Sequence, residues 1–111
     1  MLAYSHIALR INKLQKEIKE RFALTWTEYL ILCAIANLSE SDQVITPIDV
    51  HNELGHNKRW TYKSIDNLVE KKLIRIGHET ESWNPGGIRI TYGGDLVLKA
   101  AERIMGNAIH N

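Results

Sequence analysis

The sequence has few of the features that mark a protein for export, membrane insertion or metal chemistry. It contains one cysteine in 111 residues, so no intramolecular disulfide can form, and a lone thiol is typical of a reducing compartment. No apolar run is long enough to cross a bilayer, and the first residues, MLAYSHIALRINKLQ, show no apolar core of a secretory signal. Metal-ligand spacing, a Gly-rich phosphate loop and a Ser-His-Asp arrangement are also missing. We therefore predict a cytoplasmic protein that is not an enzyme and uses neither a metal nor a cofactor.

Charge is balanced over the whole chain but unevenly distributed along it. The net charge is +1, and the 44% hydrophobic and 24% charged content is ordinary for one globular domain. Between residues 57 and 75, six cations accompany two acidic residues, so this segment carries +4 and the remainder of the chain carries −3. The asymmetry indicates a surface that faces an anion.

An amphipathic helix is predicted over residues 5–21, because apolar residues recur there every three or four positions. Charged residues fill the opposite face. The apolar stripe is suited to pack either on the body of the protein or on a second copy of the chain. Its members are Ile7, Ile11, Leu14 and Ile18.

Capping signals predict two more helices in the first half of the chain. Residues 25–28, TWTE, have the form of a capping box, and the apolar run 29–36 that follows is expected at the centre of the fold. A second start is indicated by Thr46 followed by Pro47, and Gly55 ends that short helix. The apolar run 29–36 includes Cys33, which we interpret as an inert core cysteine.

The second half predicts a helix, a hairpin and a last helix. Asn57 is a natural N-cap, and the core face of the helix that follows is formed by Thr61, Ile65, Leu68 and Val69. Alternation of apolar and polar residues over 73–79 and 87–92 predicts two strands, with a turn at 84–87 and a tip near Trp83. The last helix is expected from about residue 91 or 95 to 108.

This order of elements is that of a winged helix-turn-helix, a mainly α member of the α+β class with a three-helix core and a β-hairpin wing. We expect a single domain, 1–111, with an N-terminal helix (1–22), the core (23–92) and a C-terminal helix (93–111). Four stretches carry a family resemblance: LTWTEYLIL (24–32), ITPIDVHNELG (45–55), NKRWTYKSIDNLVEKKLIR (57–75) and IRITYGGDLVL (88–98). They resemble the MarR-type transcription regulators and their SarA-like relatives. The resemblance implies a dimeric regulator that binds double-stranded DNA, with recognition helix 57–71 and terminal helices that build the dimer.

Within this frame, the exposed side of the recognition helix is expected to enter the major groove. Arg59, Lys63 and Asn67 are four residues apart and are expected to form one outward row, in which Arg or Lys bonds guanine and Asn bonds adenine. Trp60 is expected either to contact thymine methyl groups or sugar, or to be partly buried against a neighbouring helix. The hairpin 74–92 is expected near the backbone or minor groove. The candidate DNA-binding residues are Asn57, Lys58, Arg59, Trp60, Tyr62, Lys63, Asn67, Arg75 and Arg89.

Two other functions remain open at this stage. A plasmid or phage protein for DNA segregation or replication would bind repeated sites, whereas a winged helix used only for protein–protein contact would bind no DNA. The preferred prediction is a homodimeric repressor whose inverted half-sites lie about 34–36 Å, or a multiple, apart. Neither an operator nor a small-molecule effector can be derived from the sequence. The candidate dimerisation residues are Ile7, Ile11, Leu14, Ile18 and Ile104.

Overall fold

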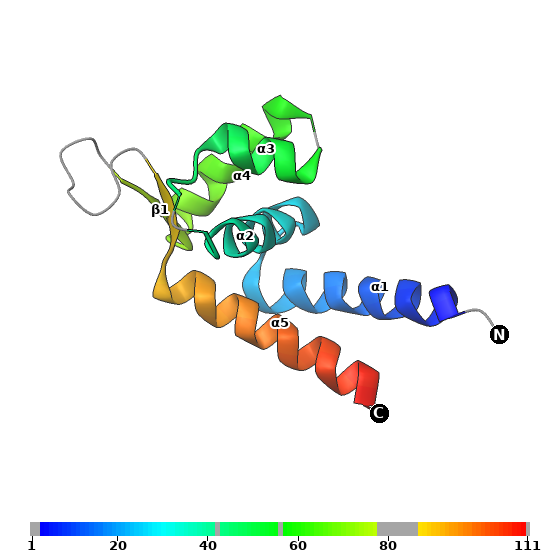
Figure 1. Cartoon of the computed structure of the whole chain (residues 1–111). Coiled ribbons are helices and arrows are strands. Elements are labelled where there is room, and N and C mark those ends of the chain that lie inside the picture. Colours follow the sequence, from blue (N-terminus) through cyan, green and yellow to red (C-terminus); the bar gives the residue numbers. More distant parts are fainter. Residues whose placement is uncertain (1–2, 42, 56, 78–86, 111) are drawn as a thin grey trace.

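A computed structural model describes residues 3–41, 43–55, 57–77 and 87–110 of the chain. Within these ranges it contains five helices and a two-stranded antiparallel hairpin (Figure 1). The elements are α1 (Ala3–Phe22), α2 (Trp26–Leu38), α3 (Pro47–Leu54), α4 (Lys58–Glu70), β1 (Ile74–Ile76), β2 (Ile88–Ile90) and α5 (Tyr92–His110). The predicted winged helix-turn-helix, mainly helical and flanked by terminal helices, is confirmed.

The helices begin where their capping residues predict. The Thr25 side chain accepts a hydrogen bond from the backbone N–H of Glu28 at 3.1 Å, and the Glu28 carboxylate accepts from the Thr25 N–H at 3.0 Å. Thr46 and Asp49 form a second capping box at the start of α3. Between α3 and α4, Gly55 adopts a positive φ of 70°, the left-handed conformation that ends a helix at little cost for glycine.

Helix α2 forms the centre of the molecule, as its uniformly apolar sequence predicts. It contacts α1, α3, α4, α5 and β2. Its buried apolar residues are Ile31, Leu32, Ala34 and Ile35. Val69 of α4, which was expected in the core, is instead exposed, as is Ile48 of α3. Val69 lies at the edge of the buried face of α4, and Ile48 lines a surface depression beside α3.

The hairpin packs its isoleucines inward and points arginines outward. Ile74 pairs with Ile90 and Arg75 pairs with Arg89. The two arginines are exposed, whereas Ile74 is buried. The backbone N–H of Ile88 also donates to the Ile45 carbonyl at 2.9 Å, which joins the hairpin to the segment before α3. The turn predicted at 84–87 and its tip near Trp83 fall largely on residues 78–86, outside the described ranges.

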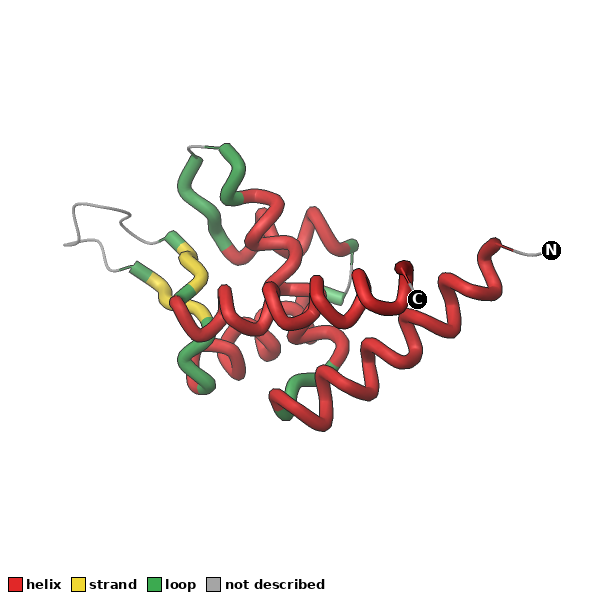
Figure 2. Tube along the Cα trace, turned by 90° about the horizontal axis from the view of Figure 1, so that it is seen from below, coloured by secondary structure: helices red, strands yellow, loops and turns green. Residues whose placement is uncertain are grey.

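Helices α1 and α5 lie side by side and extend away from the winged-helix core, as both views show (Figures 1 and 2). The molecule measures 53 × 26 × 25 Å with a radius of gyration of 14.9 Å, against about 13 Å for a compact chain of this length. The two terminal helices therefore make the molecule elongated. Among the described residues, no helix combines the length and apolarity needed to cross a membrane.

The apolar stripe of α1 is divided between the core and the surface. Leu14 and Ile18 are buried against the chain's own core, Ile11 is half-buried, and Ile7 remains 46% exposed. The expectation that all four serve a dimer is therefore wrong for Leu14 and Ile18, because the monomer already covers them. Ile104 of α5 is half-buried and packs against the same core.

Candidate nucleic-acid interface

Helix α4 is held to the body of the protein by one face. This face is formed by Thr61, Ser64, Ile65 and Leu68, all buried. At the start of the helix, the Asn57 side chain accepts hydrogen bonds from the backbone N–H groups of Arg59, at 2.9 Å, and Trp60, at 3.4 Å. These two N–H groups are therefore capped by the protein itself. The helix spans 58–70 with Asn57 as its N-cap, which agrees with the predicted 57–71.

The N-terminal half of α4 presents cations and aromatic rings to solvent. Lys58, Arg59 and Lys63 are exposed, and Trp60 is 61% exposed. The Lys63 ammonium lies 5.7 Å from the centroid of the Trp60 ring, and the Lys58 ammonium lies 5.6 Å from that of Tyr62. Within the described part of the chain, the indole of Trp60 is therefore directed to solvent and not packed against a neighbouring helix, and its contact with DNA stays a prediction.

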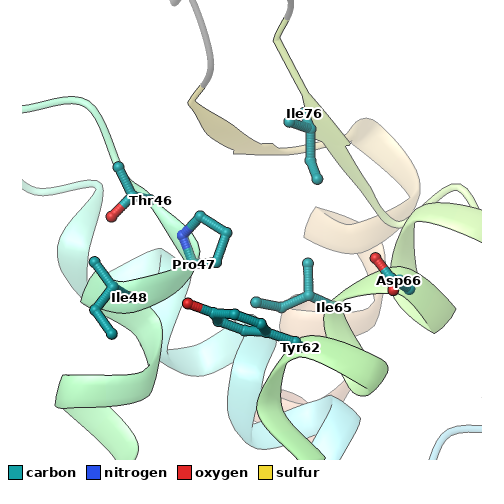
Figure 3. A pocket seen from close by; sticks show the side chains of 7 residues that line it. All are labelled: Thr46, Pro47, Ile48, Tyr62, Ile65, Asp66 and Ile76. Atoms are coloured by element: carbon teal, nitrogen blue, oxygen red, sulfur yellow. The ribbon is translucent and has the colours of Figure 1, made fainter. Parts of the chain in front are cut away.

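Tyr62 lies on a different side of α4, over a depression between α3, α4 and β1. Figure 3 shows its ring beside Pro47 and Ile48, with the hydroxyl directed toward α3. The side chain is only 38% exposed. Tyr62 therefore lies at the edge of the core. The lining residues are Thr46, Pro47, Ile48, Tyr62, Ile65, Asp66 and Ile76.

Asn67 departs from the predicted outward row. Its side chain is half-buried, and its Nδ2 donates to the Glu28 carboxylate at 3.2 Å. The Lys71 ammonium donates to the same carboxylate at 2.7 Å and to the Ala23 carbonyl at 2.8 Å. The four-residue spacing of Asn67 and Lys71 places both on the flank of α4 that faces the start of α2. Glu28 thus has a second role besides capping, which the sequence pattern alone did not reveal.

The environment of Glu28 keeps its carboxylate ionised despite burial. The side chain is 2% exposed, and burial by itself raises the pKa of a carboxyl group. The Lys71 ammonium and the donors from Thr25 and Asn67 outweigh that effect and hold the pKa of Glu28 below its ordinary value of 4.5. A buried ion pair therefore joins the start of α2 to the end of α4.

The hairpin adds cations beside the helix-turn-helix unit. Arg75 and Arg89 lie directly opposite each other across the two strands and line a shallow depression with Ile90 and Thr91. Across the part of the chain that the structure describes, no three His, Cys, Asp or Glu side chains form a metal-ligating group.

Cys33 lies on α2 and is half-buried. Burial raises the pKa of its thiol, and a hydrogen bond with Tyr29 offsets only part of this effect. The thiol is therefore poorly ionised at neutral pH, although Cys33 is half-buried and lies outside the buried core in which it was predicted.

The fold is shared with solved regulators of the MarR type. A MepR variant from S. aureus bound to oligodeoxyribonucleotide is 16% identical, with a TM-score of 0.76 over 99% of this chain and 81% of that one. A MarR variant from E. coli complexed with operator DNA is 19% identical, with a TM-score of 0.63 over 94% and 74%. A MarR-family transcriptional regulator from Rhodococcus sp. is 16% identical, with a TM-score of 0.67 over 91% and 69%. No protein-family model and no curated protein matches the sequence. The predicted resemblance to MarR-type proteins is thus supported at the level of fold.

Proposed function

We propose that this protein binds double-stranded DNA sequence-specifically and regulates transcription. The proposal rests on one observation: Lys58, Arg59 and Lys63 lie on the exposed N-terminal half of α4. In a helix-turn-helix, this half of the second helix contacts base edges in the major groove. Two neighbours in fold, the MepR and MarR variants, are themselves bound to DNA.

The exposed cations divide into two roles. Arg59 and Lys63 are one helical turn apart, and each can bond O6 and N7 of guanine. Lys58, Arg75 and Arg89 contact phosphates, Lys58 at the start of α4 and the arginines on the wing. Asn67 is excluded from the set that contacts bases, because Glu28 already binds its amide.

We infer a homodimer from the projecting part of α1. Tyr4 and Ile7 lie one turn apart near the start of α1, on one side of the helix, and both are exposed. A second copy packed there would cover these residues and set two α4 helices on inverted half-sites, about 34–36 Å or a multiple apart. Occupation of a promoter by such a dimer blocks transcription, so we propose a repressor. Sedimentation equilibrium tests the dimer: Ile7→Lys should give a monomer, whereas an unchanged mass would contradict the interface.

DNA binding is tested by titration onto duplex DNA at several salt concentrations. We expect Lys58→Ala to weaken binding to all sequences and to lower the slope of log K against log salt by about one unit. Arg59→Ala should weaken binding by about 1–3 kcal/mol and relax specificity at one base pair. Lys19→Ala, which removes an exposed cation of α1, is the matched control and should change neither quantity.

The length of the footprint distinguishes a regulator from a segregation protein. A short protected palindrome supports the regulator, and protection that spreads over repeated sites supports the segregation protein. Absence of salt-dependent binding by the parent protein to any duplex would refute both and favour a protein-interaction module.

A further inference from the structure

Trp60 is the largest apolar side chain on the exposed face of α4, and the chain's own core leaves it uncovered. Aromatic residues of this size usually bury most of their surface. Trp26 does pack on a neighbour, with its ring 5.2 Å from that of Tyr29, whereas Trp60 is 61% exposed. Its surroundings are Arg59 and Lys63, with which it lines a shallow depression. An uncovered indole between two cations is suited to a surface that is both anionic and partly apolar.

The position of Trp60 restricts which part of a DNA duplex it can meet. It is the third residue of α4, in the half of the helix that contacts base edges in the proposed complex. The Lys63 ammonium stacks on the ring at 5.7 Å, so the indole and this cation extend from α4 together. Trp60 is therefore positioned to contact base edges in the major groove and not the flanking phosphates.

The major groove offers one distinct apolar group, the C5-methyl of thymine. An indole packed on that methyl removes apolar surface from water on both partners, whereas cytosine presents no methyl at the same place. We propose that Trp60 determines specificity by contacting a thymine methyl group, next to the guanines bound by Arg59 and Lys63. This inference rests on the proposed function and names one base of its site.

The experiment replaces thymine by uracil, which removes the methyl group and leaves the hydrogen-bonding edge intact. Duplexes that the parent protein retains are first selected from a randomised library. Each thymine of the selected site is then replaced in turn, and affinities are measured for the parent, Trp60→Ala and Trp60→Phe. Trp26→Phe is the matched control, because Trp26 lies on α2 and packs on Tyr29. Thermal unfolding of each variant checks that the fold is retained.

We expect uracil at one position in each half-site to weaken binding by the parent about fourfold, the value of one buried methyl group. Trp60→Ala should bind the thymine duplex more weakly and show no further loss with uracil. Trp60→Phe should restore part of the difference in affinity between the thymine and uracil duplexes, and Trp26→Phe should keep all of it. A uracil penalty that persists in Trp60→Ala, or is absent from every position, would overturn the inference while DNA binding stands. Loss of affinity by Trp60→Ala for single-stranded DNA only would also overturn it, in favour of base stacking. Selection of no duplex by the parent would refute the proposed function itself.

Discussion

Replacing Glu28 by glutamine is expected to lower the free energy of unfolding by about 2–3 kcal/mol at neutral pH. The carboxylate is 2% exposed and accepts from the Lys71 ammonium at 2.7 Å, the Thr25 N–H at 3.0 Å and the Asn67 amide at 3.2 Å. Glutamine has the same shape, but an amide NH2 group replaces one carboxylate oxygen. This hydrogen-bond donor then faces another donor. The buried network therefore loses its charge and at least one hydrogen bond.

The magnitude follows from the kind of bond that is lost. Hydrogen bonds to charged groups contribute about 1.5–3 kcal/mol, and truncating one partner of a buried ion pair costs about 3–5 kcal/mol. The Lys71 side chain is 36% exposed, so solvent screens it and the lower part of that range applies. The unfolding entropy of 111 residues is about 0.23 kcal/mol/K, so the Tm should fall by about 10 °C.

The loss of unfolding free energy caused by Glu28→Gln should be larger at neutral pH than at acidic pH. Because the pKa of Glu28 in the folded protein is below its ordinary 4.5, ionised Glu28 stabilises the fold fully above pH 4.5. This stabilisation disappears as the pH falls through the lowered pKa. The difference between the parent and Glu28→Gln should therefore be largest near neutral pH and shrink below pH 4.5.

Urea denaturation followed by circular dichroism, at neutral pH and below pH 4.5, measures both effects. Arg21→Gln is the control, because it breaks an exposed ion pair with Glu17 on α1 and should cost less than about 1 kcal/mol. A double-mutant cycle with Lys71→Met should show coupling to Glu28→Gln. Equal losses for Glu28→Gln and Arg21→Gln, or strict additivity in the cycle, would refute the reasoning.

Three further predictions concern single residues. A Cβ at Gly94 would lie 2.2 Å from the Leu73 carbonyl oxygen, so Gly94→Ala should destabilise by about 2–4 kcal/mol in urea denaturation. Gly106 has open space, so Gly106→Ala within the same helix should instead stabilise by about 0.5–1 kcal/mol; equal effects would contradict the steric argument. Lys72 has a positive φ of 63°, so Lys72→Gly should be neutral or stabilising by up to about 1 kcal/mol, unlike glycine in a helix. The Cys33 thiol, whose pKa burial raises, should be alkylated at pH 7–8 far more slowly in the folded protein than in urea; equal rates would show an accessible thiolate.

The sequence predicts those parts of the fold that short-range chemistry determines. Thr25, Thr46 and Asn57 cap helices through hydrogen bonds that reach only two or three residues along the chain, so local spacing locates them. The strands 74–76 and 88–90 follow from the alternation of isoleucine and arginine. Such features need no knowledge of what packs against them.

The misplaced residues are those whose partners are distant in the sequence. Asn67 binds Glu28, 39 residues away, and helical spacing describes only the angle of a side chain about the axis of α4. Leu14 and Ile18 form a stripe that is suited equally to a partner subunit and to the chain's own core, and only the folded structure shows the latter. The sequence left two environments open for Trp60 for the same reason. Local spacing does not show which residues of α4 are covered by neighbouring helices.

The Glu28 network also connects the helix proposed to bind DNA with the helix proposed to build the dimer. Lys71, the C-cap of α4, binds both Glu28 and the carbonyl of Ala23, the residue that follows α1. We expect that loosening this contact changes the angle between α1 and α4 while every exposed cation of the DNA-binding face is retained. In a dimer that angle sets the spacing of the two α4 helices. Glu28→Gln should therefore weaken binding to paired half-sites more than binding to a single half-site, with an unchanged salt slope. Equal losses on the two duplexes would instead place the effect within the contacts of α4 itself.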